Sequence, residues 1–254
     1  MDWATLAAFL AMVAIGTYVQ AVTGFAMALV LMALVAAFGL LPIPEAAAVT
    51  ALLTATMAAA FLHGQWRLVD RRLVWPLLVC NGPGVLGGLA LLTWLGAREM
   101  EVVRLGFGLF AVAAGVSVIL RPVPRPTRSP RWHTGVFGGL GGVFAGLFAV
   151  GGPVMAYHLY RQPVPLADVR ATLAVLFLVG NAGRSVVVGA AGDLDGTTLT
   201  LFVAGLPVVF AFTALGRRFP PSVTDRTMRR LSSVLVVAVG AFVGGMAAFS
   251  LGSP

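Results

Sequence analysis

The chain has 254 residues, of which 59% are hydrophobic and 10% are charged, and its mean hydropathy is +0.96. This composition excludes an ordinary soluble domain and supplies several runs long enough to cross a bilayer. The net charge of +8 comes with 17 basic residues, all of them arginine and most of them in short loops, so it predicts membrane topology and argues against a nucleic-acid partner. The single cysteine, Cys80, permits no intrachain disulfide and no cysteine metal cluster.

Apolar segments follow one another along the chain, separated by short charged turns. The N-terminus begins Met1, Asp2, Trp3 without a positively charged leader, so we expect the first apolar segment to belong to the structure and not to a cleaved signal peptide. This succession predicts an all-α, polytopic protein of the lipid bilayer. The segments cover residues 3–19, 24–40, 45–62, 73–95, 102–120, 134–149, 153–160, 169–189, 198–215 and 231–250.

A Pro-Arg linker over residues 121–132 divides the single predicted domain, 1–254, into two repeats, 1–120 and 133–254. Residues of the first repeat recur in the second at spacings that drift between 120 and 128 residues. Weak internal symmetry of this kind is typical of transporter folds. The matched pairs are Gly24 with Gly151, Phe25 with Gly152, Pro42 with Pro163, Pro44 with Pro165, Gly64 with Gly192, Gly96 with Gly216, Arg98 with Arg218 and Arg104 with Arg230.

Val150, Gly151, Gly152 and Pro153 interrupt the apolar run from Val136 to Tyr160. Proline has no N–H and glycine resists helical order, so this stretch predicts a break in the helix. Proline also suits the first position of a new helix, whose unpaired N–H groups would point back at the break. A helix N-terminus inside a membrane is a candidate anion site.

The segment 153–160 spans only about 12 Å, too little for a hydrocarbon core of about 30 Å, so it must return to the side it came from. We therefore predict that 134–160 is a re-entrant hairpin and that 3–40, bent at Gln20–Phe25, is its partner in the first repeat. The longer arms of 3–40 leave two nearly full spans as an alternative. With three full spans after each hairpin, the second repeat is predicted to be inverted relative to the first.

This arrangement places fourteen arginines on one face of the membrane and only two, Arg98 and Arg104, on the other, with Arg184 left inside a span. The positive-inside rule then predicts a plasma-membrane protein with the Arg-rich linker in the cytoplasm and both termini outside. A second repeat that was not inverted would expose the cluster from Arg217 to Arg230 on the outside, so we reject it. The fourteen are Arg67, Arg71, Arg72, Arg121, Arg125, Arg128, Arg131, Arg161, Arg170, Arg217, Arg218, Arg226, Arg229 and Arg230.

Three short motifs resemble the repeated signatures of the sulfite exporter TauE/SafE family, also called the toluene-sulfonate uptake permease family. They are Gln20, Thr23, Gly24, Phe25; then Gly146, Leu147, Phe148, Gly151, Gly152, Pro153; and Asp168, Val169, Arg170, Ala171, Thr172. The resemblance implies export or uptake of a small anion such as sulfite or an organosulfonate. One departure is that Phe25 and Ala26 follow a single glycine, where many members have a fuller glycine run.

Substrate-binding residues are predicted at both breaks. Gly151, Gly152 and Pro153 would cradle the anion in the second repeat, while Gln20, Thr23, Gly24 and Phe25 would do so in the first, where Gln20 and Thr23 are neutral donors. Phe25 and Phe148 would close the pocket against water. The alternative is that the glycines only let helices approach closely.

Arg184 is the one basic residue inside a predicted span, with Asn181 one turn deeper on the same side. A guanidinium at membrane depth suits a sulfonate or sulfite, so both residues are candidate ligands. The alternatives are that Arg184 snorkels towards Asp193 or Asp195 and that Asn181 holds helices together. Asn81 is interpreted as the cap of a kink.

Thr50 and Thr54 are interpreted as hydroxyls bonded back to their own helix. No histidine pair has metal-ligand spacing, and no nucleophile with a base lies at depth, so no metal, cofactor or catalytic residue is expected. None of the nine acidic residues falls in the middle of a predicted span, which argues against a carboxylate proton relay.

The sequence thus favours a permease for a small anion, working by alternating access at paired broken helices. Export or import, the energy source and a homo-oligomeric state stay open. An assembly subunit of a larger complex is the main alternative function, and an intramembrane enzyme is a weaker one.

Overall fold

The computed structural model describes residues 3–23, 26–96, 100–119, 125–218 and 225–252, and over these residues it contains helices and loops without any strand. The prediction of an all-α fold is confirmed. The helices are α1 (Trp3–Thr23), α2 (Met27–Phe38), α3 (Ile43–Leu62), the 3-10 turn η1 (Trp66–Leu68), α4 (Arg71–Gly96), α5 (Met100–Ile119), α6 (Arg131–Phe148), α7 (Gly152–Tyr160), α8 (Leu166–Ala190), α9 (Gly196–Arg218) and α10 (Asp225–Gly252).

Five helices in the described residues, α1, α3, α4, α8 and α9, are long and apolar enough to cross a membrane. The two helices that follow the predicted breaks are much shorter. α2 has 12 residues and α7 has 9. At 1.5 Å per residue they reach about 18 and 13 Å, well short of a hydrocarbon core of about 30 Å. By length α1 can span and α2 cannot, which argues against two full spans over 3–40, and the re-entrant hairpin there stays a prediction.

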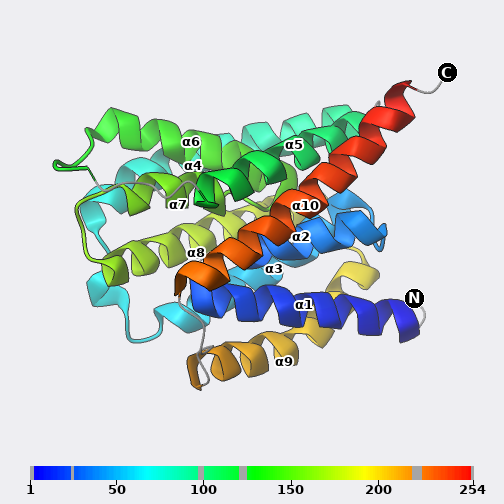
Figure 1. Ribbon diagram of the computed structural model, residues 1–254, viewed down its shortest axis with the longest axis horizontal. Helices are drawn as coiled ribbons and strands as arrows, with labels where there is room; N and C mark the ends of the chain where they lie inside the picture. Colours follow the sequence, from blue (N-terminus) through cyan, green and yellow to red (C-terminus); the bar gives the residue numbers. More distant parts are fainter. Residues whose placement is uncertain (1–2, 24–25, 97–99, 120–124, 219–224, 253–254) are drawn as a thin grey trace.

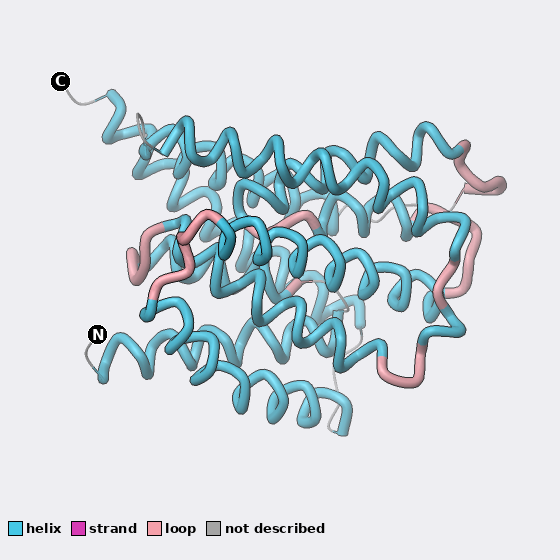
Figure 2. Tube along the Cα trace, turned by 180° about the vertical axis from the view of Figure 1, so that it is seen from behind, coloured by secondary structure: helices cyan, strands magenta, loops and turns pink. Residues whose placement is uncertain are grey.

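The long helices run roughly along the longest axis of the molecule, with the oblique α10 crossing them (Figure 1). The two chain ends lie at one end of the bundle, and the loop before α6 lies at the opposite end. Figure 2 shows the other loops gathered at these two ends, with short interruptions inside the bundle. Helices that precede residues 121–132 pair closely with helices that follow them: α3 with α8, α5 with α10, α4 with α6, and α1 with α9.

Glycines let two of these helix pairs meet backbone to backbone. A Cβ on Gly84 or Gly88 of α4 would collide with the carbonyl oxygens of Gly139 and Val143 on α6. The α5–α10 pair does the same through Gly108, where a Cβ would lie 2.6 Å from the Cα of Gly244. Small residues bring membrane helices together in this way because lipid offers no hydrophobic force to do so.

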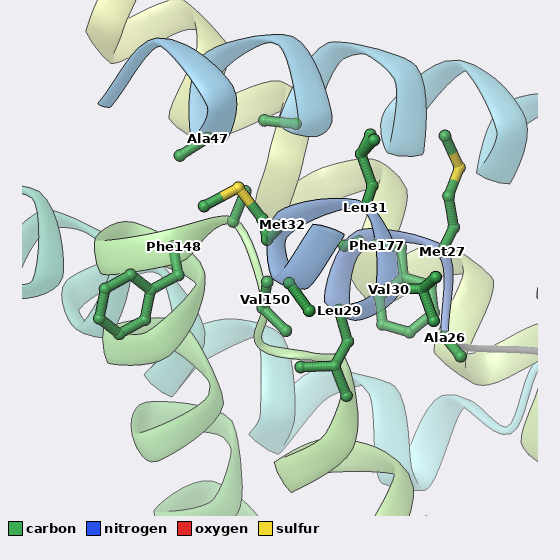
Figure 3. Packing of buried hydrophobic residues seen from close by; sticks show 14 of the residues in the cluster. Ala26, Met27, Leu29, Val30, Leu31, Met32, Ala47, Phe148, Val150 and Phe177 are labelled. Carbon is green, nitrogen blue, oxygen red and sulfur yellow. The ribbon is translucent and has the colours of Figure 1, made fainter. Parts of the chain in front are cut away.

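Helix α2 lies at the centre of the apolar core. All of its residues from Met27 to Val35 are buried, so it is hydrophobic on every side, as expected of a helix enclosed by others. Figure 3 shows α2 between Ala47 on α3, Phe177 on α8 and Val150 in the segment between α6 and α7. Helix α2 therefore lies directly beside the interruption between α6 and α7.

Candidate functional site at the α6–α7 break

The predicted interruption of the helix is present. α6 ends at Phe148 and α7 begins at Gly152, with Gly151 as its N-cap. Ala149 turns the chain with a positive φ of 57°, a left-handed conformation that an alanine rarely adopts. The N–H groups of Ala149 and Val150 close the end of α6 by donating to the carbonyls of Ala145 (2.9 Å) and Phe144 (3.3 Å). Pro153 then stands in the first turn of α7, where its missing N–H costs nothing.

The first turn of α7 presents amides without partners. Met155 donates its N–H to Gly151 at 3.4 Å, but within the described residues the N–H groups of Gly152 and Val154 find no backbone acceptor. Such orphan donors carry the positive end of the helix dipole. The break therefore offers hydrogen-bond donors and partial positive charge in the interior of the bundle.

These residues line a closed central cavity of about 10 Å³, room for about one water molecule. Gly151, Gly152 and Pro153 form one side of it, and Asn181 of α8 forms another. Ala28, in the first turn of α2, also lines it, so the N-terminal ends of both short helices border the same space. The remaining lining residues are Thr54, Asn81, Ala145, Ala149, Val150, Met155, Leu176, Phe177 and Gly180.

Two buried oxygen atoms in this lining lack a hydrogen-bond partner. They are Oγ1 of Thr54, whose residue is 2% exposed, and Oδ1 of Asn181, whose residue is 4% exposed. Asn181 uses its Nδ2 to donate to the carbonyl of Phe177 at 3.0 Å, which leaves the oxygen as the free end. Buried polar atoms are normally paired, so two orphans around one cavity indicate a place for a polar guest.

Two sequence interpretations are wrong here. Thr50 and Thr54 do not bond back to α3, because the hydroxyl oxygen of each is buried without any partner. Asn81 does not cap a kink, because its Nδ2 donates across to the carbonyl of Gly138 on α6 at 3.4 Å while the residue lines the cavity. A polar residue at depth in an apolar helix was the available signal for both Thr54 and Asn81.

Arg184 lies one turn beyond Asn181 and outside the cavity lining. It is 1% exposed, and its Nε donates to the carbonyl of Gly146 at 3.2 Å while Nη1 is buried without a partner. The ion pairs of the described residues, Arg104 with Glu101 and Arg128 with Asp70, do not include it. Arg184 therefore does not snorkel to water and keeps a buried charge beside the break.

Among the ligands predicted near the end of α1, Gln20 does not line the central cavity. Gln20 accepts a hydrogen bond at its Oε1 from the N–H of Met27 at 3.0 Å, and it lines a different cavity. Gly24, Phe25 and the side chain of Thr23 lie outside the described residues. Of the predicted ligands, the structure brings together Gly151, Gly152, Pro153 and Asn181, and it keeps Gln20 and Arg184 apart from them.

The architecture and the cavity are those of a helical membrane protein with a small polar site between short helices. The family model described as sulfite exporter TauE/SafE matches residues 8–243. The chain belongs to this family, whose members are membrane transporters and not enzymes.

Two curated relatives cover most of the chain. It is 32% identical over 231 residues to a probable sulfite/organosulfonate exporter TauE of Cupriavidus necator, covering 91% of this chain and 90% of the relative. It is 28% identical over 184 residues to a probable inner membrane transporter protein TsaS of Comamonas testosteroni, covering 72% of this chain and 76% of the relative. No solved structure matches significantly.

Proposed function

We propose that the chain carries a small sulfur oxyanion, sulfite or an organosulfonate, across the plasma membrane through the cavity at the α6–α7 break. The observation that carries the proposal is the set of unpaired polar groups around one buried space: the α7 amides, Oγ1 of Thr54 and Oδ1 of Asn181. The printed name of the Cupriavidus necator relative supports this substrate class.

The unpaired groups suit the singly protonated form of sulfite, whereas a sulfonate has no O–H to offer Asn181. The amides of α7 and the hydroxyl of Thr54 donate hydrogen bonds to oxygens of the guest, while Oδ1 of Asn181 accepts one from its O–H. Arg184, with Nη1 unpaired one turn away, supplies the balancing positive charge. A proton that travels on the substrate removes the need for a carboxylate relay.

Transport requires the central cavity to open, because a space of about 10 Å³ holds one water and no larger guest. We propose alternating access between two inverted repeats, with the linker in the cytoplasm and both termini outside. The pairing of equivalent helices, α3 with α8 and α5 with α10, supports the repeats. The position of the chain ends and of the loop before α6 at opposite ends of the bundle supports the orientation (Figure 1).

The test is transport of labelled sulfite and of methanesulfonate by the purified chain in proteoliposomes. Wild-type protein should move at least one of them, and Gly152→Leu and Arg184→Gln should each slow it by about tenfold or more, since the leucine side chain would fill the cavity and the glutamine would remove the buried positive charge beside the break. Gly183→Ala is the control, because a Cβ there meets open space. A wild-type chain that neither binds nor moves these anions would refute the proposal, and full activity of the lone chain excludes an assembly subunit.

A further inference from the structure

A second and larger cavity lies at the linker end of the bundle. It holds about 190 Å³, enough for several water molecules or a small anion with some of its hydration. Ala21 near the end of α1, Phe61 near the end of α3, Arg170 near the start of α8 and Thr213 near the end of α9 line it. In Figure 1 these four helix ends lie at the same end as the loop before α6.

Arg170 is the charged residue in this lining. Its Nε is buried without a hydrogen-bond partner, and so is Oγ1 of Thr213 across the cavity. The ion pairs of the described chain leave Arg170 aside, whereas Asp70, whose N–H donates to Oγ1 of Thr172 on α8, is paired with Arg128 at 3.0 Å. A guanidinium and a hydroxyl that face one space without protein partners form a site for an anion.

One side chain borders both this cavity and the central one. Phe177 lines both. Arg170, Ala174, Phe177 and Asn181 are spaced by four, three and four residues along α8, so they lie on one face of the helix. Arg170 and Asn181 are thus about 16 Å apart along the axis, with the Phe177 ring between them.

We propose that the linker-end cavity is a second anion site, in which Arg170 holds the substrate before or after it passes Phe177. The movement of substrate past Phe177 rests on the proposed transport function, while the binding of an anion beside Arg170 does not. Anion binding at Arg170 can therefore be probed by a reaction that needs no transport.

The experiment places a cysteine in this cavity. Cys80→Ser removes the native thiol, and Ala174→Cys adds one beside Arg170 on the same face of α8. Inside-out vesicles are treated with methanethiosulfonate reagents of equal size, one carrying a sulfonate and the other a trimethylammonium group. A focused positive charge raises local anion concentration, so the anionic reagent should react about fivefold faster or more than the cationic one, when each rate is divided by that reagent's rate with a free thiol in solution. Added methanesulfonate should slow that reaction.

Three further substitutions in the protein that carries Cys80→Ser and Ala174→Cys test whether Arg170 causes the charge preference. Arg170→Gln should abolish the preference for the anionic reagent, and Arg170→Lys should retain most of it. Arg161→Gln is the control for general charge at this end, because Arg161 donates to Oη of Tyr157 at 3.0 Å and does not line the cavity. Equal normalised rates of the two reagents when Arg170 is intact, or a preference that survives Arg170→Gln, would overturn the proposal.

Phe177→Ala tests the passage separately. It should make liposomes that contain the protein leak methanesulfonate faster than wild type, because the barrier between the cavities is gone. A charge preference of the thiol introduced by Ala174→Cys, without any transport, would refute the proposed function and leave the second site standing. Transport without a charge preference of that thiol would refute the second anion site and leave the proposed transport function standing.

Discussion

The two short helices α2 and α7 begin in similar places and treat their first amides differently. The N–H of Met27 at the start of α2 is bonded by Oε1 of Gln20, a side chain of the preceding helix. Its counterpart at the start of α7, the N–H of Gly152, has no acceptor among the described residues, while Ala28 and Leu29 of α2 leave their N–H groups without a backbone acceptor just as Val154 of α7 does. An amide that a side chain already satisfies is less available to a bound anion than an unpaired one. The comparison therefore predicts that the substrate contacts the first amide of α7 and not the first amide of α2.

Gly151→Ala should give the largest effect. A Cβ at this position would collide with the carbonyl oxygen of Gly141 on α6, so the start of α7 must shift. We expect transport to fall by about a hundredfold or more, since misplacement of donors by about 1 Å has effects of that order. The measurement is initial-rate sulfite flux in proteoliposomes. Gly183→Ala on α8, where no atom is within reach, should keep wild-type flux.

Thr54→Val should have the second largest effect. It removes a hydroxyl from the cavity but hardly changes side-chain volume, and a hydrogen bond to a charged guest contributes about 1.5–3 kcal/mol, so the apparent affinity should fall by about tenfold or more. Thr54→Ser should restore it. The matched control is Thr56→Val, because Thr56 donates to the carbonyl of Leu52 at 2.9 Å on the same helix. Equal affinity in both valine variants would remove Thr54 from the site.

Gln20→Met should act on stability more than on transport. It leaves the N–H of Met27 buried without an acceptor, which costs about 1–3 kcal/mol. Thermal unfolding in detergent should show the loss, while the apparent affinity for sulfite should change by less than about twofold, a difference of under about 0.4 kcal/mol. A large loss of affinity with unchanged stability would mean that Gln20 contacts the substrate and is not only the acceptor for Met27.

Ala149→Gly should have the smallest effect and the opposite sign. Relief of the left-handed strain at this alanine is offset by the greater freedom of glycine in the unfolded chain, for a net stabilisation of about 0.5 kcal/mol. The end of α2 offers the reverse comparison, because Gly39 has φ 59° and Gly39→Ala should destabilise the protein. Unfolding midpoints of the two variants should move in opposite directions.

Much of the fold follows from local chemistry. Arginine placement and apolar run lengths predict a helical membrane protein, and Gly151, Gly152 and Pro153 predict the break because neither residue type supports a continuous helix. The family resemblance rests on the same motifs, and it is confirmed. The inverted orientation and the individual substrate ligands stay predictions.

The hydrogen-bond partners could not be predicted in the same way. Whether Gln20 faces a substrate or the start of α2, and whether Thr54 meets its own helix or an empty space, depends on how helices distant in sequence pack. Arg184 shows the same limit. Its depth follows from counting residues, but its bond to the carbonyl of Gly146 needs the position of α6.

The glycine contact between α4 and α6 restricts how the molecule can move. Where Gly84 and Gly88 touch α6, no side chain is available to repack, so sliding or parting these two helices would open a gap that nothing fills. We therefore expect α4 and α6 to move together as one rigid body during transport. Relative motion is then expected at a hinge over Ala149–Gly151 and along the side-chain contacts of α8. A crosslink between α4 and α6 should leave transport intact.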